Sequence, residues 1–198
     1  PDLTSNEVTG LGTWSQQDIV DFLQTGANQH TQVYGTMTDV VQHSTSKMTV
    51  EDLNAMAVYM KTIPASPEPK PKTVEASLIA AGKPIYDKSC ASCHGAEGKG
   101  EPLLYPKLAG SAGVNAPNGT GVARIILTGN MPGPHTTIAS VDPMPSLADK
   151  LSDKDVAAVA TYVRNSWGNK AGAVTEKQVA KLRAHVVKPA ATPAPAAP

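Results

Sequence analysis

The pentapeptide Cys90-Ala-Ser-Cys93-His94 constrains this chain of 198 residues more than any other feature. Two thiols three residues apart can each add to one vinyl group of a haem, and the histidine that follows can then bind the iron. The motif therefore predicts one covalent haem c on Cys90 and Cys93, with His94 as an iron ligand.

Other interpretations of the cysteine pair fit the sequence less well. A thioredoxin-like redox pair needs a βαβ context, which the pattern of the chain does not show. A zinc site needs further ligands, and the remaining histidines (30, 43, 135 and 185) are not spaced as a second pair. A disulfide framework needs cysteines spread along the chain, whereas these two are neighbours.

The second axial ligand has to come from further along the chain. The candidates are Met131, His135, Met144 and His185. We favour Met144, because the prolines on both sides of it stiffen the backbone, whereas Met131 precedes a looser Pro-Gly pair. Iron bound by both histidine and methionine leaves no position for a substrate, as in an electron carrier. An open sixth position would instead indicate a peroxidase-like haem enzyme or a haem-based sensor.

Composition adds limits on the core and on the partners. Hydrophobic residues make up 40% of the chain but aromatic residues only 4%, which is little for a large core and suits a domain that wraps a cofactor. The 17 basic and 17 acidic residues balance, so no nucleic-acid partner is expected. No apolar run reaches the roughly 18 residues of a membrane span. The first ten residues, PDLTSNEVTG, do not read as a signal peptide.

The pattern of the chain predicts an all-α protein. Helices are expected after the hydroxyl residues Ser15, Thr49 and Ser152, each followed by early acidic residues, and no run of alternating strands occurs. Residues 64–73 (PASPEPKPKT) indicate an exposed linker. We expect a helical haem domain over 74–170, and a short helix with a Pro/Ala-rich tail over 171–198.

An internal repeat links the two halves of the chain at an offset of 103 residues. Residues 19–26 (IVDFLQTG) align with 122–129 (VARIILTG), and 49–61 align with 152–164. At this offset the counterpart of Cys90 would precede Pro1. We therefore interpret residues 1–63 as the C-terminal part of a second such domain that lacks its own Cys-x-x-Cys-His. An upstream segment is expected to supply that motif and a second haem.

Several segments together resemble class I c-type cytochromes. They are GKPIY (82–86), CASCHG (90–95), YPKLAG (105–110), Met-Pro (144–145) and SDKDVAAVATYVRNSWG (152–168). The resemblance is closest to the multi-haem cytochrome c subunits of bacterial membrane-bound dehydrogenases, and residues 10–64 resemble the end of a preceding haem domain.

This resemblance implies further residues and partners. It implies that the carbonyl of Pro106 lies beside the haem-binding histidine, and that Met37 corresponds to the axial methionine of the preceding domain. It also implies a dehydrogenase catalytic subunit (a quinoprotein, flavoprotein or molybdoprotein) as electron donor and a membrane quinone or oxidase as acceptor. The expected location is the periplasmic face of the bacterial inner membrane.

Overall fold

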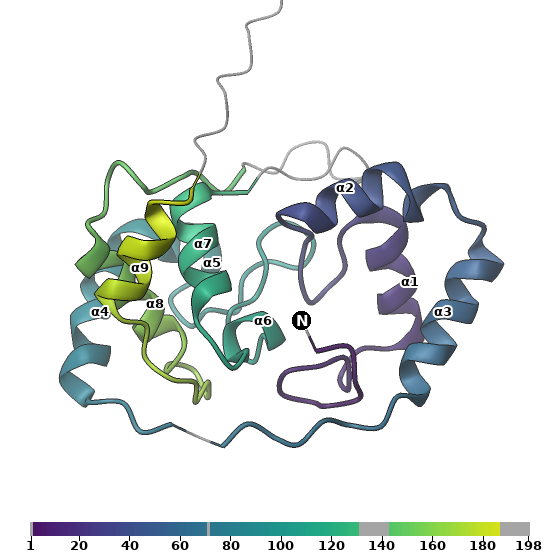
Figure 1. Cartoon of the computed structure of the whole chain (residues 1–198), viewed down its shortest axis with the longest axis horizontal. Helices are drawn as coiled ribbons and strands as arrows, with labels where there is room; N and C mark the ends of the chain where they lie inside the picture. Colours follow the sequence, from purple (N-terminus) through teal and green to yellow (C-terminus); the bar gives the residue numbers. More distant parts are fainter. Residues whose placement is uncertain (1, 71, 131–142, 187–198) are drawn as a thin grey trace, which may run out of the picture.

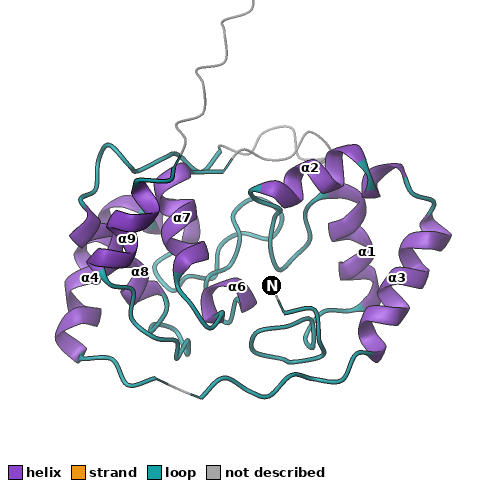
Figure 2. Ribbon diagram, viewed as in Figure 1, coloured by secondary structure: helices purple, strands orange, loops and turns teal. Residues whose placement is uncertain are grey.

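A computed structural model describes residues 2–70, 72–130 and 143–186. Within these ranges the regular secondary structure is helical, and the extended contacts are isolated β-bridges rather than strands (Figure 2). The helices are α1 (Gln16–Thr25), α2 (Thr36–His43), η1 (Thr45–Lys47), α3 (Val50–Thr62), α4 (Ala76–Ser89), α5 (Ala91–His94), α6 (Ala112–Asn115), α7 (Thr120–Thr128), α8 (Asp153–Val163) and α9 (Glu176–Arg183). The predicted all-α fold is confirmed.

The three helix starts predicted from hydroxyl residues are found where the sequence places them. The side chain of Ser15 accepts a hydrogen bond from the backbone of Asp18, and Ser152 does the same with Asp155. Thr49 caps α3 in the same way. Each cap satisfies a backbone N–H group that the first helical turn leaves without a partner.

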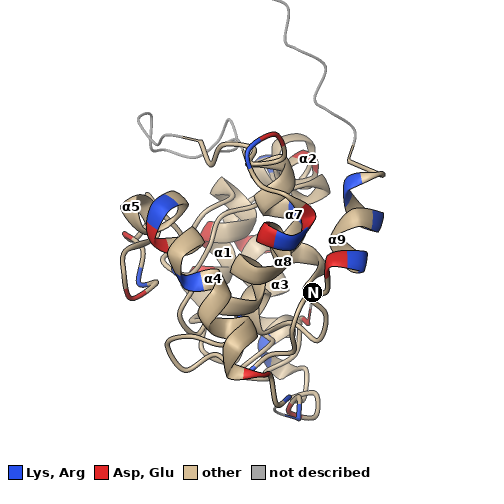
Figure 3. Ribbon diagram, turned by 90° about the vertical axis from the view of Figure 1, so that its left-hand side faces the viewer, with Lys and Arg blue, Asp and Glu red and all other residues tan. Residues whose placement is uncertain are grey.

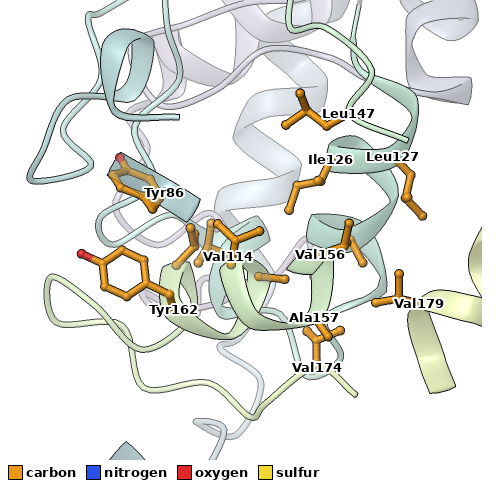
Figure 4. Packing of buried hydrophobic residues seen from close by; sticks show 14 residues of the cluster. Tyr86, Val114, Ile126, Leu127, Leu147, Val156, Ala157, Tyr162, Val174 and Val179 are labelled. Carbon is orange, nitrogen blue, oxygen red and sulfur yellow. The ribbon is translucent and has the colours of Figure 1, made fainter. Parts of the chain in front are cut away.

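The described helices form two groups that lie side by side (Figure 1). Helices α1 to α3 surround a small core of Ile19, Val20, Leu23, Leu53 and Ala57. Helices α4 to α9 surround a larger one that includes Leu127 and Val156 (Figure 4). Residues 64–70 and 72–75, between α3 and α4, are irregular and lie along one edge of the molecule (Figure 1).

Helices α4 and α8 cross at close range in the second group. A Cβ atom on Gly82 would lie 2.2 Å from the carbonyl oxygen of Ala158, so only glycine allows this approach. Three rings pack beside it, of which Figure 4 shows Tyr86 and Tyr162. The ring centroids are 5.4 Å apart in Tyr86 and Tyr162, and 4.9 Å apart in Tyr86 and Trp167. This cluster contains three of the few aromatic residues in the chain.

The described residues after 170 include the helix α9, which packs on the preceding helices. Val174 and Val179 are buried in the larger core, and α9 packs against α7 and α8. The guanidinium of Arg183 donates to Asp153 at 2.6 Å. Residues 171–186 therefore pack with the preceding helices, because their apolar side chains complete that core. The Pro/Ala-rich stretch 188–198 lies outside the described residues.

Several further helices were not predicted from the sequence, α2 and α6 among them. Helix α2 begins after Gly35 and α6 after Ser111, and neither start has a side-chain cap. The predicted repeat is visible in the helix bounds: α1 and α7 end 103 residues apart, at Thr25 and Thr128. Helices α3 and α8 begin at the same separation.

Charged residues are dispersed over the surface. Figure 3 shows the positions of basic and acidic residues interspersed along the ribbon on the side of the molecule that carries α4 and α9. Among the described residues, no helix combines the length and apolar character that would let it cross a bilayer.

Candidate cofactor cavity

A largely apolar cavity opens between the helices of the second group. It encloses about 1320 Å³ of empty space, its open mouth included. Its lining includes Val114, Ile126, Leu147, Val159 and Val163, all of which belong to the larger core. In most helical domains such apolar side chains pack directly against one another, whereas here they line a cavity. A cavity of this kind suits a flat apolar ligand.

The Cys-x-x-Cys-His motif lies on the rim of this cavity. Helix α4 ends at Ser89, and the single turn of α5 brings Cys90, Cys93 and His94 to the cavity lining. Both thiols are free. Burial, reinforced by the neighbouring Cys93, raises the pKa of Cys90 to about 11, so its thiol is protonated at neutral pH.

His94 is oriented by a backbone carbonyl. Its Nδ1 lies 2.9 Å from the carbonyl oxygen of Pro106, as the resemblance implies. A carbonyl can only accept, so Nδ1 donates its proton and Nε2 keeps a lone pair for a metal. Burial lowers the pKa of His94, although the Pro106 carbonyl opposes this effect. The neutral imidazole is the form that ligates iron.

The segment around Met144 is fixed against the end of α7. The backbone N–H of Asn130 donates to the Met144 carbonyl at 2.9 Å, and the Ser146 hydroxyl donates to Leu127 at 2.6 Å. Gly129 has a left-handed φ of 67°, and a Cβ atom there would lie 2.4 Å from the Met144 carbonyl. Met144 lines the same cavity as His94, and these hydrogen bonds restrain its backbone.

The other proposed ligands are placed differently. Met131 and His135 lie outside the described residues. His185 is exposed just after α9 and is not among the residues that line the cavity. Met37, on α2, is partly buried and packs against the small core of the first helix group.

The donor set fits haem c. One apolar cavity brings together two free thiols, a neutral oriented imidazole and a thioether, which are the groups that attach and ligate this cofactor.

Part of the lining was not predicted from sequence. Thr31, Gln32 and Tyr34 come from the first helix group yet face the cavity of the second. They belong to no motif, and the repeat does not indicate them, because their role depends on how the two groups pack.

Comparison with known proteins also indicates haem c. The model of the family Cytochrome c matches residues 79–167, so this segment is a cytochrome c domain. The chain is also 37% identical to the cytochrome c subunit of the quinone-dependent alcohol dehydrogenase of Gluconobacter oxydans (strain 621H), over 92% of this chain and 41% of that subunit. It is 36% identical to the gluconate 2-dehydrogenase cytochrome c subunit of Pantoea cypripedii, over 88% of this chain and 42% of the relative.

The fructose dehydrogenase cytochrome subunit of Gluconobacter japonicus is 28% identical over 93% of this chain. The chain thus spans about two-fifths of the length of these curated relatives. The cytochrome c domain is of the kind that carries covalent haem c, and the relatives are named as cytochrome subunits. They do not favour the haem enzyme or the sensor.

Proposed function

We propose that this chain carries one haem c on Cys90 and Cys93, with His94 and Met144 as axial ligands. In this proposal it is the electron-transfer part of a membrane-bound dehydrogenase complex. The observation that supports it best is that all four side chains line a single apolar cavity.

Each residue has a distinct task in this proposal. Haem supplies one-electron exchange between ferric and ferrous iron. Cys90 and Cys93 hold the macrocycle covalently at the rim. The Pro106 carbonyl keeps Nε2 of His94 directed into the cavity. Met144 would supply a thioether ligand to the iron, and the apolar lining would exclude water, which would favour the reduced state and raise the potential.

The expected partners follow from the relatives. Those relatives are cytochrome subunits of alcohol, gluconate and fructose dehydrogenases. We therefore propose that a quinoprotein, flavoprotein or molybdoprotein catalytic subunit reduces this chain at the periplasmic face of the bacterial inner membrane. A membrane quinone or an oxidase would receive the electrons.

The first helix group supports a second haem domain. Tyr162 on α8 is 9% exposed beneath α4, whereas its repeat counterpart Tyr59 on α3 is 69% exposed. Its neighbour Val58 is 51% exposed, so one apolar face of α3 has no covering helix among the described residues. We propose that residues 1–63 end a second cytochrome domain. An upstream segment would supply the covering helix and another Cys-x-x-Cys-His.

Met37 is the proposed ligand of that second haem. In the structure its side chain packs against the core formed by Ile19, Leu23 and Leu53. Met144 packs against the larger core in the same way, so this packing is compatible with ligation.

Carbon monoxide distinguishes the proposed carrier from an open haem site. The chain would be produced in a host that attaches haem c, reduced with ascorbate and mixed with carbon monoxide. An unchanged absorption spectrum is expected, because Met144 occupies the sixth position. Rapid, complete carbon monoxide binding would favour an enzyme or a sensor instead. Met144→Ala provides the control that should bind the gas.

A further inference from the structure

A segment of the first helix group forms one wall of the cavity. Residues 31–34 follow α1 and precede α2, and Thr31, Gln32 and Tyr34 all line the cavity of the second group. The segment is fixed on its own side, because the N–H of the buried Val33 donates to the Gly26 carbonyl at 2.7 Å. Because it is held in place, this segment can restrain the residues of the second group that it contacts.

One hydrogen-bonded tie joins this segment to the loop on the His94 side. The side-chain amide of Gln32 donates to the carbonyl oxygens of Leu103 at 2.8 Å and Leu104 at 3.2 Å. Leu103 has a left-handed φ of 66°, an unfavourable conformation for a branched side chain, and it is 45% exposed. The loop leads directly to Pro106, whose carbonyl orients His94.

A second tie joins the segment to the Met144 side. The side-chain amide of Asn130 donates to the Val33 carbonyl at 3.0 Å. The backbone N–H of the same residue donates to the Met144 carbonyl at 2.9 Å. Asn130 thus bonds the wall segment and the backbone of Met144 at the same time.

From these two ties we infer that residues 31–34 act as a clamp that holds the His94 loop and the Met144 segment together across the edge of the cavity. Gln32 and Asn130 are its positioning residues. The inference rests on the proposed haem function and extends it, since it makes the first helix group a determinant of the redox properties of the haem in the second.

The clamp has two measurable consequences. Loss of a tie admits water to the cavity edge, and a more polar environment stabilises the ferric state, so the midpoint potential falls. It also frees the Met144 backbone, so an added ligand competes more easily with the thioether. A typical hydrogen bond shifts an equilibrium about fivefold.

The experiment uses the whole chain with its covalent haem and compares Gln32→Met with Asn130→Ala. Gln17→Ala is the matched control, because the Gln17 amide is exposed and donates to the Asp21 carboxylate within α1. Imidazole added to the ferric protein is the competing ligand. Both clamp variants should show a lower midpoint potential and about fivefold tighter imidazole binding, and the control should show neither.

Combining the two clamp substitutions tests whether they act on one element. The double variant should fall short of the product of the single effects, because both ties hold the same segment. Unchanged potential and imidazole affinity in both single variants, with haem still attached, would overturn the clamp. Absence of covalent haem on the unsubstituted chain would instead contradict the proposed function on which it rests.

Discussion

Lys61 and Arg164, 103 positions apart in the repeat, make the same tertiary contact in their own halves of the molecule. The Lys61 ammonium donates to the Leu11 carbonyl at 3.3 Å, and the Arg164 guanidinium donates to the Val114 carbonyl at 2.6 Å. Leu11 and Val114 are themselves 103 residues apart. The two halves therefore share a long-range contact as well as a helix pattern, which supports their common architecture.

The two cations should differ in their contribution to stability. Arg164 is 1% exposed and also donates to Ala116, Asn118 and Gly172. Arg164→Met leaves four carbonyls without this donor, the buried one of Val114 among them, and should lower the free energy of unfolding by about 3–5 kcal/mol. Lys61→Met should cost about 1 kcal/mol, because water can reach the carbonyls it leaves.

Urea unfolding measures both costs, with Lys170→Met as a control at an exposed position. Equal losses of stability for Arg164→Met and Lys61→Met would contradict the prediction that the more buried cation contributes more.

Truncation of the two repeat-related tyrosines should change the free energy of unfolding by very different amounts. Tyr162→Ser removes a buried ring that packs against Tyr86 and Trp167, and should cost about 3 kcal/mol. Tyr59→Ser in this chain should change stability by less than about 0.5 kcal/mol, since the ring is 69% exposed. The same Tyr59 substitution should become destabilising in a natural polypeptide that includes an upstream haem domain. A negligible effect there would argue against a covering helix.

The identity of the sixth ligand can be decided by spectroscopy. Met144→Ala should abolish the methionine-to-iron charge-transfer band of the ferric protein and lower its potential, since a thioether stabilises ferrous iron. Met131→Ala should do neither. The reverse outcome would assign the ligand to Met131.

His30 should make the first helix group sensitive to mild acid. Its ring stacks on Trp14 at 5.1 Å, and its Nε2 lies 3.2 Å from the carboxylate of Asp18. Burial lowers the pKa of His30, Lys107 adds to this effect, and Asp18 only partly opposes it. The unfolded chain, with an ordinary histidine pKa of about 6.5, therefore binds the proton first.

Stability should consequently fall as the pH decreases below about 6.5, until the folded state is protonated as well. Urea midpoints between about pH 8 and pH 5 measure this loss, which His30→Gln should reduce and His43→Gln, at an exposed position, should not. An increase in the stability of the chain from about pH 8 to pH 5 would contradict the predicted direction of this effect.

Local chemistry made much of the fold predictable. Ser15, Thr49 and Ser152 cap helices because their hydroxyls satisfy nearby N–H groups, and the haem motif is read from five adjacent residues. Helix α2 lacks such a cap, and the burial of Val179 depends on helices distant in sequence. The contacts of Gln32 and Asn130 are equally invisible in sequence, because they join segments about 70 to 100 residues apart.

Covalent haem on this chain is the central claim, and intact mass after acid–acetone extraction tests it most directly. The unsubstituted chain, produced in a host that attaches haem c, should retain the mass of one haem, because thioether bonds survive this extraction. The Cys90→Ser/Cys93→Ser variant should retain none. Haem retained by the double variant, or no haem on the unsubstituted chain, would contradict the account.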